Sequence, residues 1–134
     1  MDLGLKGKIA AITGGSEGIG KATAMLLAAE GAKVAICARR KDVLETAVAE
    51  IRKQGGGDVL AVSCDVTQPG QVDNFVQQAI DAWGGIDILV NNVGTSFAAS
   101  FESVSDEGWQ SDFDLKLFSA IRASRVAIPS MRRR

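Results

Sequence analysis

The chain has 134 residues, of which 46% are hydrophobic and 23% charged, and its formal net charge at pH 7 is −1. This length fits one domain with a single core, and the composition excludes a mostly disordered chain. The near-neutral charge disfavours a nucleic-acid partner, and no apolar run approaches the roughly 20 residues of a membrane span. His and Tyr are both missing, so we expect no His-ligated metal site. The first residues lack the basic start of a signal peptide, and we therefore expect a cytoplasmic protein.

Short apolar runs alternate with amphipathic segments through the first half of the chain. They predict strands over residues 8–13, 33–38 and 58–64, with helices over 18–30 and 41–54 between them. Gly31 and the run 55–57 are natural helix stops. Cys37 and Cys64 close two of the strands and do not form a CxxC pair, so we expect small buried side chains rather than metal ligands.

The second half continues the same alternation. Thr67 is predicted to cap a third helix that carries Pro69 in its first turn and ends at Trp83. A fourth strand is expected over residues 86–90, a loop over 95–105, and a last helix, capped by Ser105, from there towards the chain end. Arginines 132–134 read as a solvated helix end, with a docking patch as the alternative. This order predicts an α/β domain with a parallel sheet covered by helices on both faces.

A glycine cluster, Thr13–Gly20, follows the first strand and opens the first helix. Backbone N–H groups at such a helix start form an anion site suited to a pyrophosphate. A Walker loop is disfavoured because Ala22 stands where that motif needs a hydroxyl. The GxGxxG fingerprint also fails, since Thr23 replaces its last glycine. The spacing that fits is TGxxxGxG.

Two further motifs occur at the ends of predicted strands, Cys64-Asp65-Val66 and Asn91-Asn92-Val93-Gly94. With the glycine cluster and the final helix, they make the chain resemble the short-chain dehydrogenase/reductase family over essentially all its residues, but only over the N-terminal half of a typical member. The resemblance implies a Rossmann-type doubly wound sheet of about four strands in the order 3-2-1-4, as one incomplete dinucleotide-binding domain over residues 1–134. It also implies hydride transfer between a nicotinamide and a small-molecule carbonyl or secondary alcohol.

The resemblance and the strand-end positions select a set of candidate cofactor contacts: Gly14, Ser16, Glu17, Gly18, Ile19, Gly20, Arg39, Arg40, Asp65, Val66, Asn91, Val93 and Gly94. Ligands of open parallel sheets bind beyond the carboxyl ends of the strands. Asp65 can accept a hydrogen bond from the adenine amine, or it can cap the turn before Pro69. Asn91 can face the cofactor crevice, or it can bond its own backbone as a turn residue.

Charge at the end of the second strand favours NADP(H) over NAD(H). Ala38 stands where NAD-using relatives carry Asp, and Arg39 and Arg40 follow it. Guanidinium groups suit a 2′-phosphate, whereas a carboxylate suits a free ribose hydroxyl. Glu17 is a departure, because many NADP-using relatives have Lys or Arg there; it can pair with Arg39. The alternative for the two arginines is an ordinary charged helix start.

The family's catalytic Ser, Tyr and Lys are expected on a fifth strand and the next helix, which these residues do not include. Lys116 stands at the position that is usually Asn and shares a predicted helical stripe with Trp109, Phe113 and Ala120. It is therefore a candidate to point inward and act in proton transfer or bind an acidic substrate group; the alternative is a lysine that reaches solvent. The loop 95–101 is expected to line the substrate entrance.

Two functional hypotheses remain open on the sequence. The first is the NADP(H)-binding portion of an oxidoreductase, and residues 1–134 alone are expected to be inactive. The second is a non-catalytic nucleotide-binding module, such as a redox sensor or an assembly subunit. The fourth strand and last helix are predicted to leave apolar surface uncovered, which favours a homo-oligomer.

Overall fold

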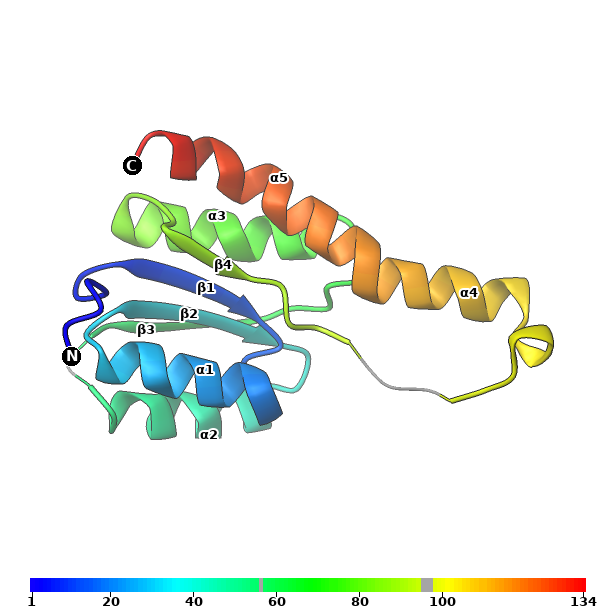
Figure 1. Ribbon diagram of the computed structural model, residues 1–134, viewed down its shortest axis with the longest axis horizontal. Helices are drawn as coiled ribbons and strands as arrows, with labels where there is room; N and C mark the ends of the chain where they lie inside the picture. The colour runs from blue at the N-terminus through cyan, green and yellow to red at the C-terminus, as the bar shows by residue number, and fades with distance from the viewer. Residues whose placement is uncertain (56, 95–97) are drawn as a thin grey trace.

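The computed structural model of the protein describes residues 1–55, 57–94 and 98–134. Strands and helices alternate along the chain as the sequence predicts (Figure 1). In order they are β1 (Ile9–Thr13), α1 (Gly18–Ala29), β2 (Lys33–Ala38), α2 (Lys41–Arg52), β3 (Val59–Ser63), α3 (Gln71–Trp83), β4 (Ile88–Val90), the 3-10 turn η1 (Phe101–Ser103), α4 (Asp106–Phe113), the π-helical turn η2 (Asp114–Phe118) and α5 (Ser119–Arg132).

The strands form one parallel sheet in the order β3-β2-β1-β4, which confirms the predicted Rossmann-type topology. The register places Thr13 of β1 beside Cys37 of β2, and Cys37 beside Val62 of β3. The carboxyl ends of these three strands therefore lie side by side. The segments that follow them, including the glycine cluster, share that edge of the sheet.

Helices cover both faces of the sheet, with α1 and α2 on one side and α3 and α5 on the other (Figure 1). Side chains alternate along each strand, so Val34 and Ile36 pack with α1 and α2, while Ala35 and Cys37 pack with α3 and α5. All of β1 and the interior of β2 are buried. The central strands are continuous apolar runs because neither face meets water.

Among the differences from the predicted boundaries, those of β4 and α3 bear on the site. The fourth strand is shorter than expected and begins at Ile88, and the Ile86 N–H donates to Ser130 Oγ at 3.0 Å instead of to a neighbouring strand. The third helix starts at Gln71, after Gly70 in a left-handed conformation (φ +89°), so Thr67 does not cap it. The Thr67 N–H and hydroxyl instead both donate to Asp65 Oδ1, at 3.0 and 2.7 Å. The turn that carries Pro69 is closed by this local bonding.

The predicted last helix is α4, η2 and α5 in direct succession. The Ser105 cap is confirmed, since its Oγ accepts from the Gly108 N–H at 3.1 Å. The π turn is wider than an α turn and interrupts the predicted regular helix. Trp109 and Phe113, which share the predicted stripe with Lys116, are themselves 37% and 45% exposed, so the stripe does not face the core. Lys116 is exposed and its ammonium pairs with Asp112 at 2.9 Å. The ammonium of Lys116 therefore reaches solvent, as the alternative predicts, while the stem of its side chain passes close to Gly94.

The chain's final arginine has a specific partner. Arg134 Nε and Nη2 donate to Asp87 Oδ1 and Oδ2 at 2.7 and 3.1 Å, and the Ile9 N–H donates to Asp87 Oδ2 at 2.9 Å. Arg134 thus ties the end of the last helix to the amino end of β1, rather than being the freely solvated group that the sequence suggested.

Apolar side chains on the last helix are uncovered, as predicted. They are Trp109, Phe113, Leu117, Phe118, Ile121 and Ile128, each more than a third exposed. In the part of the chain that the structure describes, no helix is long and apolar enough to cross a membrane.

Candidate cofactor site

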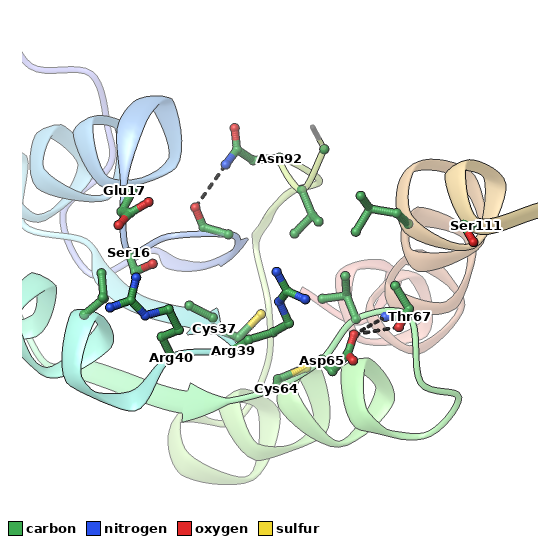
Figure 2. Close-up of a pocket in the computed structure, with 17 residues that line it drawn as sticks. Ser16, Glu17, Cys37, Arg39, Arg40, Cys64, Asp65, Thr67, Asn92 and Ser111 are labelled. Carbon is green, nitrogen blue, oxygen red and sulfur yellow. Dashed lines mark hydrogen bonds between the residues drawn. The ribbon is translucent and has the colours of Figure 1, made fainter. Parts of the chain in front are cut away.

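A cavity of about 500 Å³ opens at the carboxyl ends of β1, β2 and β3 (Figure 2). Its walls come from the glycine cluster, the segments after β2, β3 and β4, and one face of α4 and η2. The lining residues are Gly14, Ser16, Glu17, Cys37, Ala38, Arg39, Arg40, Val43, Cys64, Asp65, Val66, Thr67, Asn92, Val93, Gly94, Ser111 and Leu115. The position agrees with the rule that open parallel sheets bind ligands at this edge.

The glycine turn is held against the end of β2. The Gly14 and Gly15 N–H groups both donate to the Cys37 carbonyl, at 3.1 and 3.2 Å. Helix α1 then begins at Gly18, whose φ of +56° is left-handed, and the preceding Glu17 makes no side-chain capping bond to it. The first N–H groups of an uncapped helix point at whatever lies before it. This turn therefore offers backbone donors and a positive dipole end to an anion.

Asn92 connects the glycine turn to β4, a role that the sequence analysis missed. Its Nδ2 donates to the Gly14 carbonyl at 3.1 Å, and its backbone N–H donates to Thr13 Oγ1, also at 3.1 Å. Asn91 lies outside the cavity wall, exposed, with Nδ2 donating to Ser124 Oγ at 3.5 Å. Neither proposed role of Asn91 is seen. Side-chain alternation past a strand end could have singled out Asn92, since consecutive residues there face opposite ways.

The cavity carries both signs of charge. Asp65 Oδ1 accepts the two bonds from Thr67, and these lower the pKa of Asp65, helped by the positive charge of Arg39. Arg40 pairs with Asp42 at 3.3 Å, and both side chains are mostly exposed. Within the described residues Arg39 has no such ion pair, and its guanidinium extends into the space between Asn92 and Asp65 in Figure 2. The expected pairing of Glu17 with Arg39 is therefore not seen.

Both cysteines line the cavity as well. Cys37 and Cys64 are buried free thiols, as the sequence predicts, and they contact each other. The neighbouring Cys64 thiol raises the pKa of Cys37, with burial adding to the effect, and Cys37 in turn lowers the pKa of Cys64. No sequence spacing indicated this pair, because strand register alone brings residues 37 and 64 together.

Most of the candidate cofactor contacts line this cavity, and a few do not. Gly18, Ile19 and Gly20 form the helix start beside the cavity rather than its wall. Lys116 is not part of the wall either, although its neighbour Leu115 is, along with Ser111 one turn earlier. Residues 95–97 of the expected substrate loop lie outside the described residues.

Known proteins share this fold and sequence. A family model described as short chain dehydrogenase matches residues 8–134. An uncharacterized oxidoreductase, YvrD of Bacillus subtilis, is 37% identical over 131 residues, covering 98% of this chain and 49% of the relative. The 2,5-dichloro-2,5-cyclohexadiene-1,4-diol dehydrogenase LinX of Sphingobium indicum is 38% identical over 127 residues, covering 95% of this chain and 50% of that protein.

Solved structures also match this chain in fold and sequence. The L-sorbose reductase of Gluconobacter frateurii, complexed with NADPH and L-sorbose, has a TM-score of 0.95 and 41% identity over 99% of this chain and 51% of its own. The NADH-dependent reductase A1-R′, complexed with NAD, has a TM-score of 0.90 and 32% identity over 99% of this chain and 56% of its own. The chain spans about half the length of the curated relatives it matches. With a family model matched from residue 8 to residue 134, this chain belongs to the short-chain dehydrogenase family.

Proposed function

We propose that this chain is the cofactor-binding portion of an NADP(H)-dependent oxidoreductase that acts on a small carbonyl compound or secondary alcohol. The observation that carries the proposal is the charge at the end of β2, where Ala38, Arg39 and Arg40 all line the cavity and no carboxylate follows the strand directly. A bound nicotinamide would supply or accept the hydride. The chain's own residues hold the phosphates and the adenosine half.

The glycine turn fits a pyrophosphate. A Cβ added at Gly18 would meet nothing within 4 Å, so the outer surface of the turn is open to a ligand. A Cβ at Gly20 would collide with the Gly14 carbonyl oxygen, so the turn can hold this shape only with glycine there. Free N–H groups and close backbone approach are what a pyrophosphate requires.

The two arginines have different roles in this proposal. Arg40 already has an anionic partner in Asp42, whose pKa is lowered first by the Val43 N–H and then by Arg40. Arg39 faces the cavity, so we assign it the main contact with the 2′-phosphate, which it can bind in fork geometry. Glu17 lines the same cavity and opposes the phosphate by charge repulsion.

Asp65 fits the adenine side of the site. Its lowered pKa keeps the carboxylate ionised at neutral pH, and ionised carboxylates accept hydrogen bonds only. Thr67 occupies Oδ1, and among the described residues Oδ2 has no donor. The second oxygen can therefore accept from an exocyclic amine while Oδ1 keeps the turn closed.

The remaining roles rest on the resemblance. The chain has no Tyr, so the family's acid/base group would lie in a longer protein. Lys116 stays a candidate proton donor, since a side chain at Gly94 on the cavity wall would meet the Lys116 stem. A homo-oligomer remains our proposal for covering the apolar side chains of the last helix.

Adenosine phosphates without a nicotinamide test the arginine assignment directly. We expect 2′,5′-ADP to bind more tightly than 5′-AMP in isothermal titration calorimetry, by about 1–3 kcal/mol for a charge-assisted contact. Arg39→Ala should remove most of this difference, and Arg40→Ala, its matched control, should remove less. Equal affinities for the two nucleotides in the wild-type chain would refute the NADP(H) assignment.

A further inference from the structure

A second, smaller cavity of about 290 Å³ lies between the start of α1 and the start of α2. Its polar lining residues are Ser16, Glu17, Lys21, Asp42 and Thr46. Ser16 and Glu17 also line the cofactor cavity, so the two cavities adjoin across the glycine turn. Figure 2 shows Ser16 and Glu17 at the end of the cofactor cavity away from Ser111. The smaller cavity, here called the side pocket, extends the cofactor cavity at that end.

Lys21 is the one cationic side chain that lines the side pocket among the described residues. Its Nζ pairs with Glu50 Oε2 of α2 at 2.9 Å, and Glu50 itself is not part of the pocket wall. Asp42 pairs with Arg40, whereas Glu17 has no ion pair among the described residues. The pocket therefore holds one uncompensated carboxylate, and its cation is bound to a group outside the pocket.

Lys21 lies one helical turn after Glu17. Its N–H donates to the Glu17 carbonyl at 3.2 Å, and residues four apart in a helix share one face. Helical side chains lean towards the N-terminus of their helix, so the flexible four-carbon stem of Lys21 can carry its ammonium back towards the glycine turn. The cation that many NADP-using relatives have at position 17 is thus present in this chain at position 21.

The ion pair between Lys21 and Glu50 is weak enough to open. The two side chains are 30% and 40% exposed, and ion pairs this accessible to water contribute little to stability because water screens the charges. A phosphate monoester carries a charge of about −1.5 to −2 at pH 7 and three acceptor oxygens, against a single charge on Glu50. A phosphate at the side pocket therefore competes successfully with Glu50 for the ammonium.

We propose that Lys21 is a specificity-determining residue for NADP(H): when the cofactor binds, the ammonium leaves Glu50 and binds the 2′-phosphate at the side pocket. This contact adds to that of Arg39 and offsets the repulsion by Glu17. Glu50 holds Lys21 when no phosphate is bound, and so limits how strongly the site favours a 2′-phosphate. The inference rests on the proposed function, because it needs a 2′-phosphate at the end of the cavity that Glu17 lines.

Calorimetry with two nucleotides tests this role. The preference for a 2′-phosphate is the Kd of 5′-AMP divided by the Kd of 2′,5′-ADP. Lys21→Gln should lower this ratio about 5- to 10-fold, as expected for a charged contact that water partly screens. Glu50→Gln should raise it about 1.5- to 5-fold, because it frees the ammonium.

Two controls separate a direct contact from a change in charge. The double variant, Lys21→Gln with Glu50→Gln, keeps the net charge of the wild type but has no ammonium, and it should show the low ratio of Lys21→Gln. Lys53→Gln removes the same charge from an exposed lysine after α2, outside both cavities, and should keep the wild-type ratio.

The outcomes separate this inference from the proposed function. A pair that only ties α1 to α2 would be broken by either single variant, so it would not shift the ratio in opposite directions. An unchanged ratio in Lys21→Gln, a wild-type ratio in the double variant, or an unchanged or lower ratio in Glu50→Gln would each overturn the role of Lys21 alone. Equal Kd values for the two nucleotides in the wild-type chain would refute the proposed function and this inference with it. Glu50→Gln keeps the test decisive even if Lys21→Gln does not fold.

Discussion

Alanine substitutions at Gly20 and Gly18 separate the stability of the glycine turn from its binding of phosphate. At Gly20 the added Cβ would collide with the Gly14 carbonyl oxygen, which is backbone and cannot rotate away. Relief requires displacing the turn and breaking the 3.1 Å bond from Asn92 to Gly14. Overpacking costs about 1–3 kcal/mol and a lost hydrogen bond about 1 kcal/mol. We therefore expect Gly20→Ala to destabilise the chain by about 2–4 kcal/mol.

At Gly18 the added methyl meets open space, so only the left-handed backbone opposes it. That conformation costs a non-glycine residue about 1–2 kcal/mol. Gly84 provides a matched control, because it is also left-handed (φ +86°), also in open space, and follows α3 away from the cavity. Both variants should lose similar stability, but only Gly18→Ala should place a methyl group against the bound pyrophosphate.

Thermal unfolding measures the loss of stability in each variant, and calorimetry measures its affinity for NADPH. For a chain of 134 residues, 1 kcal/mol corresponds to a change in Tm of about 3–4 °C. Gly20→Ala should therefore lower Tm by about 7–14 °C, and Gly18→Ala and Gly84→Ala by about 4–7 °C. NADPH affinity should fall at least about tenfold in Gly18→Ala and stay at the wild-type value in Gly84→Ala. If Gly18→Ala binds NADPH as tightly as Gly84→Ala does, the turn is only a structural connection.

Three further predictions concern charged groups. Glu17→Lys should tighten NADPH binding relative to NADH by about 1 kcal/mol in fluorescence titrations, because it replaces repulsion of the 2′-phosphate by attraction; an unchanged ratio would contradict the placement of that phosphate. Asp87→Asn should be less stable to urea than the wild type at pH 7. The Arg134 bond lowers the pKa of Asp87 in the folded state. The difference in unfolding free energy between the two proteins should therefore shrink as the pH falls below about 3.9, the pKa of Asp in the unfolded chain. A difference that does not change with pH would rule out this linkage. Lys116→Met should leave NADPH affinity unchanged, and neither this variant nor the wild-type chain should consume NADPH with ketones; turnover lost only in the variant would make Lys116 the proton donor.

Sequence periodicity was sufficient for the sheet and its helices, because strands buried on both faces are recognisable as apolar runs such as 34–37. It located the glycine turn and the arginines, whose roles depend on residues near in sequence. Sequence periodicity missed the features that depend on contacts between residues far apart in the chain. Asn92 rather than Asn91 holds the turn, and strand register brings Cys37 to Cys64.

The π turn is the other feature that the sequence did not reveal. Residues 114–118 have no proline or glycine that would indicate a wider turn, so a regular helix was expected there. The predicted stripe itself is exposed at Trp109 and Phe113, and Lys116 pairs with Asp112. The pairing of Arg134 with Asp87 was missed for a similar reason, because 47 residues separate the two partners.

The most direct test of NADP(H) binding is a calorimetric titration of the wild-type chain with NADPH and with NADH under identical salt. The guanidinium of Arg39, which has no ion pair among the described residues, and the absence of an acid directly after β2 predict tighter binding of NADPH, by about 5- to 150-fold for a contact of about 1–3 kcal/mol. NADH binding as tightly as NADPH, or more tightly, would contradict the account.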